Sequence, residues 1–291
     1  MFQTIAELVT LAEKCGSVAE VMILAEMETT EMDREVIWQR MEKNLSVMEA
    51  SVNEGGKAVR SVSGLTGGDA KKLDEYILAG NSLNSELVIR AVRNAVAVNE
   101  VNARMGVICA NPTAGSAGVA AGVITALGEV KKLSEEEKIN FLFAAGAFGL
   151  VVAKQAYISG AMGGCQAEIG SASAMAAAAL VETLGGTPRQ CAHAFAMTIK
   201  NMMGLICDPV AGLVEVPCVK RNALGAAQAF ISADMALAGI ESVIPADEVL
   251  WAMKQVGQQM PGIFKETAEG GIAATPTAKK LEKKISASES L

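Results

Sequence analysis

The stretch from Cys207 to Asn222 limits how this chain can fold more than any other part of the sequence. It carries two cysteines, Cys207 and Cys218, in a segment interrupted by two prolines and a glycine. Proline removes a backbone donor and clashes inside a helix, and glycine favours turns. The stretch therefore cannot be one continuous helix. We expect a loop of fixed shape whose two thiols face a ligand.

The rest of the sequence predicts helices. Hydrophobic residues make up 51% of the chain and aromatic residues only 4%, which favours closely packed helices over a sandwich of strands. Helix starts are indicated by capping boxes, in which a Ser or Thr precedes an acidic residue or Gln by three positions. These are Thr4 with Glu7, Ser17 with Glu20, Thr30 with Asp33, Ser134 with Glu137 and Thr187 with Gln190. We predict an all-α, multi-helix catalytic domain in which Gly/Pro-rich loops converge on one site.

The chain is expected to comprise one main domain with an appendage. Residues 1–55 read as helices, and the third carries an apolar stripe that includes Ile37 and Leu45, typical of a helix packed on a core or a partner. Residues 56–291 form the predicted catalytic domain. Its end, 275–291, is rich in Lys, Ser and Glu and is expected to fray.

Charge and hydropathy exclude several classes of partner. A formal net charge of -7 argues against nucleic acid, because phosphate binding needs a concentrated Lys/Arg face. The first residues include Glu7 and Glu13 and do not resemble a signal peptide. The longest apolar run, 141–153, is shorter than the roughly 20 residues that span a bilayer. We expect a cytoplasmic protein without a membrane partner.

Two small-residue loops are candidate anion sites. The first includes Ser63 and Thr66 among several glycines, which would let backbone amides approach an anion; a flexible linker explains it equally well. The second contains Thr113, Ala114, Gly115 and Ser116 before an apolar helix. Unpaired amides at a helix start bind anions, but an N-cap with tight helix packing is a competing explanation.

Three of the six cysteines are candidate metal ligands. Cys165 follows a glycine-rich loop at a predicted helix start, where backbone amides favour a thiolate. Together with Cys207 and Cys218 it lies in a predicted loop, whereas Cys15, Cys109 and Cys191 are better explained as small buried residues. The close cysteine pairs of a structural zinc site are missing. A metal site and three structural cysteines both remain open on these grounds.

The sequence closely resembles the iron-sulfur-dependent bacterial L-serine dehydratases, in particular the alpha chain of the two-chain type. The resemblance rests on Gly164-Cys165-Gln166 followed by Glu168 and Gly170, on Cys207-Asp208-Pro209-Val210-Ala211-Gly212, and on Val216-Pro217-Cys218 with Arg221-Asn222. It also includes Asn111-Pro112-Thr113 with Gly115 and Gly118, and extends from the first helices to about Ala274.

The resemblance implies a [4Fe-4S] cluster held by Cys165, Cys207 and Cys218, with one iron open to substrate. Such an iron acts as a Lewis acid on L-serine and makes its hydroxyl a better leaving group. Loss of the α-proton and of water would give aminoacrylate, which becomes pyruvate and ammonia. This L-serine ammonia-lyase chemistry would need no pyridoxal phosphate.

Arg221 is the candidate for binding the substrate carboxylate, because its guanidinium can donate two parallel hydrogen bonds and it closely follows Cys218. A surface ion pair is the alternative. Asn222, Thr113 and the amides near Ala114, Gly115 and Ser116 rank second for binding the substrate, and Ser63 and Thr66 rank third.

No general base is identified in this chain. Its only histidine, His193, is better explained as structural than as a base. The resemblance implies that catalytic histidines come from a beta chain, so the partners are L-serine and that chain. Two alternatives remain: an L-cysteine desulfidase that uses the same open iron, and a non-catalytic iron-sulfur sensor.

Overall fold

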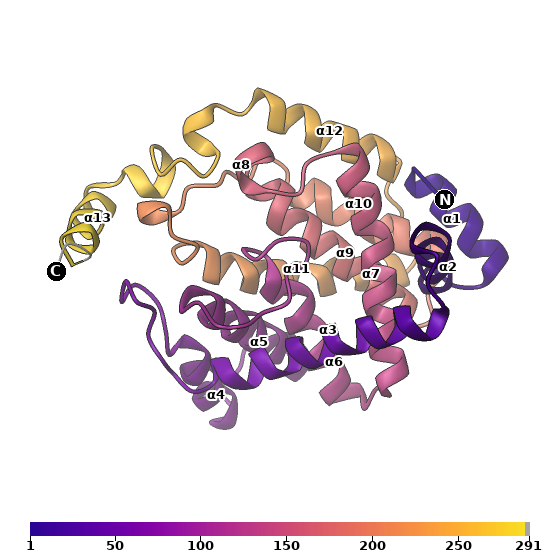
Figure 1. Ribbon diagram of the computed structural model, residues 1–291, viewed down its shortest axis with the longest axis horizontal. Coiled ribbons are helices and arrows are strands. Elements are labelled where there is room, and N and C mark those ends of the chain that lie inside the picture. Colours follow the sequence, from indigo (N-terminus) through magenta and orange to yellow (C-terminus); the bar gives the residue numbers. More distant parts are fainter. Residues whose placement is uncertain (289–291) are drawn as a thin grey trace.

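The structure is a computed structural model that describes residues 1–288 as a bundle of helices (Figure 1). The all-α prediction is confirmed: over 1–288 the backbone forms no β-strand, only an isolated bridge between Cys207 and Lys265. In chain order the helices are α1 Ile5–Cys15, α2 Val18–Thr30, α3 Arg34–Gly55, α4 Asp69–Leu78, α5 Glu86–Ala103, α6 Ala117–Lys131, α7 Glu135–Gln155, α8 Gly160–Gly163, the π-helical turn η1 Gln166–Gly170, α9 Ser171–Thr183, α10 Pro188–Met202, the 3-10 turn η2 Val210–Gly212, α11 Cys218–Leu237, α12 Ala246–Gln259, the 3-10 turns η3 Gly262–Phe264 and η4 Gly271–Ala274, and α13 Pro276–Ser288.

Helix α9 forms the centre of the bundle (Figure 1). Every residue from Ser171 to Val181 is buried, and α6, α7, α10 and α11 pack around the helix. Most of these residues are alanines, so the surrounding helices can approach closely on all sides. A helix that is apolar all round belongs in the interior. The same argument applies to α6: a Cβ atom on Gly122 would lie 2.7 Å from the Ala91 carbonyl oxygen of α5.

The first three helices share the core of the later ones. Leu8 of α1, Ile23 of α2 and Leu45 of α3 are buried in the same apolar cluster as the side chains of α7 and α9. The predicted boundary at residue 55 coincides with the end of α3. That 1–55 is an appendage separable from 56–291 stays a prediction.

The capping boxes at Thr4, Ser134 and Thr187 form as predicted. At Ser17 only half of the box forms, because the Glu20 carboxylate pairs with Arg34 at 2.7 Å instead of returning to the helix start. The predicted helix start at Thr30 is wrong. Thr30 is the last residue of α2, and α3 begins at Arg34 with Asp33 at the N-cap position, whose side chain makes no capping hydrogen bond.

Two further predictions are corrected at the carboxyl-terminal side. The segment from Cys207 to Asn222 is a loop only as far as Pro217, because α11 begins at Cys218 and carries Arg221 and Asn222 in its first turns. Proline at the residue before a helix is compatible with a helix start. The predicted frayed end also differs, since α13 forms from Pro276 and buries Ala278. The part of the predicted tail at 289–291 lies outside the described residues.

Helix α13 lies at the opposite end of the long axis from α1 (Figure 1) and packs against η2 and η4. The chain therefore returns at its carboxyl-terminal side to the loop that follows Cys207. Across 1–288 we find no helix that combines the length and apolar character needed to cross a membrane.

Partly buried acidic side chains from distant helices hold the starts of α1 and α2. Asp247 of α12 accepts hydrogen bonds from the amides of Ile5 at 2.7 Å and Ala6 at 3.0 Å. Glu182 of α9 accepts from the amides of Val18 at 3.1 Å and Ala19 at 3.0 Å. First-turn amides have no partner within their own helix, so these carboxylates fasten the N-terminal helices to the core.

We expect Asp247→Ala to lower the free energy of unfolding by about 1–2 kcal/mol, because two amides of α1 lose their acceptor. Glu248→Ala is the matched control. It removes an exposed acid from the same first turn of α12 and should change stability by less than about 0.5 kcal/mol. Urea unfolding of both variants makes the comparison. Equal losses of unfolding free energy in the two variants would contradict a stabilising role for the hydrogen bonds from the α1 amides to Asp247.

Candidate metal centre

Cys207 is held in place by backbone hydrogen bonds to the segment after η3. Its amide donates to the Phe264 carbonyl oxygen at 2.8 Å, and its own carbonyl accepts from the Glu266 amide at 2.8 Å. These bonds form the isolated bridge at Cys207. They fix the thiol through the backbone, so its position does not depend on packing of the short side chain alone.

Cys165 lies between α8 and the π-helical turn η1. The next residue, Gln166, fixes this turn: its side-chain amide donates to the carbonyls of Gly163 at 2.9 Å and Met253 at 3.1 Å, and accepts from the Gly204 amide at 2.9 Å. Single π turns are rare and occur frequently at functional sites. The sequence predicted a helix start here but gave no sign of the π turn.

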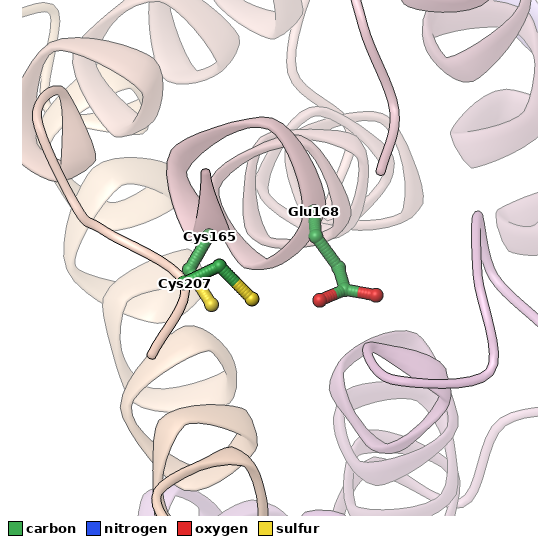
Figure 2. A group of neighbouring side chains, drawn as sticks. All are labelled: Cys165, Glu168 and Cys207. Atoms are coloured by element: carbon green, nitrogen blue, oxygen red, sulfur yellow. The ribbon is translucent and has the colours of Figure 1, made fainter. Parts of the chain in front are cut away.

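Cys165, Cys207 and Glu168 form a compact buried group, in which the two Sγ atoms and a carboxylate oxygen lie within 4.8 Å of one another. Figure 2 shows the two thiols side by side, with the Glu168 carboxylate projecting from the same side of η1. The exposed fractions are 1%, 2% and 8%. Three groups that can each bind a cation therefore share one water-poor space.

Electrostatics connect Cys218 to this group. Burial raises the pKa of the Cys218 thiol, and negative charge on Cys165 or Glu168 raises it further. A hydrogen bond from Cys207 and the positive charge of Arg221 together hold the pKa of Cys165 below its ordinary value. The same hydrogen bond and burial raise the pKa of Cys207. One thiolate is therefore favoured at Cys165, and a cation is needed before all three thiols can ionise.

Arg221 lies beside the thiols but has a partner within the chain. One guanidinium nitrogen donates to Cys165 Sγ at 3.4 Å and to the Ile206 carbonyl at 2.9 Å, and the other pairs with the Asp208 carboxylate at 2.8 Å. Asp208 in turn accepts from the Ile272 amide at 2.7 Å. Arg221 is thus neither a surface residue nor a free cation, and its binding of a substrate carboxylate stays a prediction.

Asn222 joins the start of α11 to the loop before α6. Its amide nitrogen donates to the carbonyls of Gly115 at 2.7 Å and Cys218 at 3.0 Å, and its oxygen accepts from the Gly118 amide at 3.1 Å. The residue is completely buried. These contacts give Asn222 a role in holding two segments together, and a direct contact with substrate remains untested.

The loop around Thr113 contacts Glu168, next to the thiols. Thr113 Oγ1 donates to Glu168, and Ser116 Oγ lies 3.1 Å from Thr113 Oγ1. Ser116 is buried, whereas Ala114 is exposed. A Cβ atom on Gly115 would lie 2.5 Å from Glu168 Oε1, so glycine is needed for this close approach.

The loop around Ser63 is fastened and does not behave as a free linker. Ser63 Oγ donates to Glu215 at 2.7 Å and Ser61 Oγ donates to the same carboxylate at 2.5 Å. Glu215 belongs to the segment between Cys207 and Cys218. Thr66 is buried within the loop. Both predicted anion loops therefore adjoin the cysteine segments.

Sequence reasoning gave no role to three acidic residues at this site. Glu168 follows Cys165 by about one helical turn, a spacing that could have indicated it. Asp208 and Glu266 carried no local signal: Asp208 pairs with Arg221 across the start of α11 and accepts from the remote Ile272 amide, and Glu266 comes from the segment after η3. Glu266 adopts a left-handed backbone, with φ of 64°, and its charge raises the pKa of both Cys207 and Glu168.

His193 lies on α10, where its Nδ1 accepts a hydrogen bond from the Ser242 amide at 3.1 Å. It lines a hollow with residues of α1 and α12 that none of the three metal-site cysteines adjoins. This arrangement supports the structural role expected for the histidine.

The residues of the site fit a metal cluster. Soft thiolate ligands select zinc, Cu(I) or iron-sulfur clusters, and three buried thiols come from the start of η1, the loop after α10 and the start of α11. Gly160 forms part of the wall: a Cβ atom there would lie 2.6 Å from Cys207 Sγ. The wall thus leaves space at the thiols that any larger residue would fill.

Comparison with known proteins identifies the family of the chain. A family model described as the serine dehydratase alpha chain matches residues 13–273. The chain is 61% identical over 286 residues to a probable L-serine dehydratase alpha chain of Bacillus subtilis (strain 168), covering 98% of this chain and 95% of that one. It is 40% identical to the L-serine dehydratase alpha chain of Peptoniphilus asaccharolyticus, covering 97% and 98%. An L-serine dehydratase of Streptomyces coelicolor is 37% identical over 94% of this chain but only 60% of its own length.

We expect Gly160→Ala to lower the iron content of the anaerobically purified protein while leaving the fold intact. The added Cβ would displace the Cys207 thiol but would meet no rigid backbone. Gly146→Ala is the matched control, since a Cβ there meets nothing within 4 Å and alanine favours a helix. Iron analysis with circular dichroism measures both effects. Full iron content in Gly160→Ala would contradict the role of Gly160 in leaving space beside the Cys207 thiol.

Proposed function

The chain belongs to the serine dehydratase alpha chain family, and we propose that it dehydrates and deaminates L-serine to pyruvate and ammonia. Enzymes of this family are iron-sulfur-dependent lyases. The observation that carries the proposal is that two buried cysteines from separate segments, Cys165 and Cys207, share one space with Glu168. Arg221 contacts Cys165, and negative charge on Cys165 and Glu168 raises the pKa of the third buried cysteine, Cys218.

Cys165, Cys207 and Cys218 would hold a [4Fe-4S] cluster in this space. When bound, the cluster supplies Lewis-acid chemistry that assists departure of the serine hydroxyl. Three thiolates carry a net negative charge that Arg221 partly offsets, because its guanidinium already contacts Cys165. The reaction needs no pyridoxal phosphate, because the cluster provides the electrophile.

The chain's own residues bind and orient the substrate in this proposal. The Arg221 guanidinium keeps N–H groups beyond those that contact Cys165, Ile206 and Asp208, and these can donate to the serine carboxylate. The loops with Thr113 and Ser63 border the site and exclude water from it. Asn222 and Glu215 hold these loops against the cysteine segments.

A group that removes the α-proton is expected from a beta chain. Within 1–288 the only imidazole belongs to His193 of α10, and its Nδ1 accepts a hydrogen bond from the Ser242 amide. The alpha-chain names of the relatives imply a second chain, and the Streptomyces enzyme extends well beyond the region that matches this chain. We propose that the beta chain completes the catalytic site and that the assembled enzyme acts in the cytoplasm.

We expect Cys207→Ala and Cys218→Ala each to abolish iron binding and activity, while the anaerobic wild-type protein holds about four irons per chain. Cys191→Ala is the control, because Cys191 is buried in the apolar core away from the site; it should keep its iron. Iron and sulfide analysis with the visible spectrum makes the comparison. A variant at either ligand position that keeps the complete cluster would refute the assignment.

We expect the alpha chain to need its partner chain for activity. The isolated alpha chain with its cluster should form no pyruvate from L-serine, and addition of the beta chain should restore the reaction. Parallel assays with L-cysteine separate a dehydratase from a desulfidase, since the latter would release sulfide faster than pyruvate forms from serine. Rapid turnover of serine by the isolated alpha chain would contradict the need for a partner.

A further inference from the structure

Among residues 1–288, Glu168 is the acidic residue that forms a compact group with two of the site's thiols. Its carboxylate and the Sγ atoms of Cys165 and Cys207 lie within 4.8 Å of one another. Its exposed fraction is only 8%. Figure 2 shows that the carboxylate and both thiols project from η1 and the adjoining loop toward a common space.

The two oxygens of Glu168 have different surroundings. Thr113 Oγ1 donates a hydrogen bond to Oε1, and the absence of a side chain at Gly115 gives that oxygen its room. The other oxygen, Oε2, faces the thiols: a Cβ atom built on Gly160 would lie 2.6 Å from Cys207 Sγ and 3.4 Å from Glu168 Oε2. No hydrogen bond to Oε2 occurs within the described residues. The carboxylate is therefore held through Oε1, and Oε2 is left facing the space beside the thiols.

A four-iron cluster held by three cysteines has one iron without a thiolate. Burying an ionised carboxylate without a cation is costly, and ferrous and ferric iron accept oxygen ligands. We propose that Glu168 Oε2 ligates the iron that the three cysteines leave free, in the enzyme before serine binds. This inference rests on the proposed function, because it requires the cluster.

A carboxylate suits this position because it can be exchanged. Oxygen ligands bind soft iron-sulfur centres less firmly than thiolates do, so substrate oxygens can take the place of Glu168 without removing the iron. Thr113 would keep the displaced carboxylate in its orientation through its hydrogen bond to Oε1. Glu168 would then occupy the free coordination position of this iron in the resting enzyme, and serine would displace the carboxylate when it binds.

Mössbauer spectra of the anaerobic holoprotein enriched in ⁵⁷Fe test the proposal. In the wild-type protein one iron should show an oxygen-type signal distinct from the other three, and serine should shift it. Glu168→Gln keeps the shape of the side chain and removes its charge, so this signal should change before serine is added. Glu182→Gln is the control, because Glu182 is a partly buried glutamate that binds the start of α2 instead of facing the thiols; its spectrum should match that of the wild type.

Resistance of the fourth iron to mild oxidation gives a second measurement. Loss of a ligand should speed the release of one iron by about tenfold or more in Glu168→Gln, with no change in Glu182→Gln. Water labelled with ¹⁷O distinguishes the other possible ligand: magnetic coupling from ¹⁷O in the serine-free wild-type cluster, after one-electron reduction makes the cluster paramagnetic, would overturn the proposal, as would identical Mössbauer spectra for wild type and Glu168→Gln. A wild-type chain that binds no cluster at all would instead refute the proposed function.

Discussion

The guanidinium of Arg221 and the carboxylate of Asp208 lie 2.8 Å apart in the interior, with 13% and 2% of their side chains exposed. Because Asp208 also accepts the Ile272 amide, and Arg221 also donates to Cys165 and Ile206, this pair joins η1, α11, the loop after α10 and η4. A buried charge is tolerated only when it is paired and hydrogen-bonded. The site therefore depends on both members of the pair.

The helices around this pair provide a stiff frame. Closely packed interiors resist deformation, and the small residues of α6 and α9 let neighbouring helices approach to backbone contact. The thiols are fixed by backbone bonds at Cys207 and by the Gln166 contacts next to Cys165. A cluster site benefits from such a frame, because ligands already in position lose little entropy when the metal binds.

Much of the fold could be predicted from local sequence patterns. The capping boxes at Thr4, Ser134 and Thr187 and the proline-marked loop after Cys207 depend on neighbouring residues, which the sequence displays directly. The error at Thr30 arose because Thr30 and Asp33 match the spacing of a box, although Asp33 itself begins the next helix. Likewise Pro217 ended the loop instead of extending it, since proline can stand at a helix start.

By itself the sequence determined the helical class, most of the helix starts and the proline-marked loop that carries Cys207, because propensity, capping and backbone restriction act over a few residues. Only the tertiary structure decided that Glu168 faces the thiols, that Arg221 pairs with Asp208, and that Asp247 and Glu182 cap helices far from them in the chain. These contacts join residues separated by tens to hundreds of positions. Their partners are chosen by how the whole bundle packs, which no local pattern records.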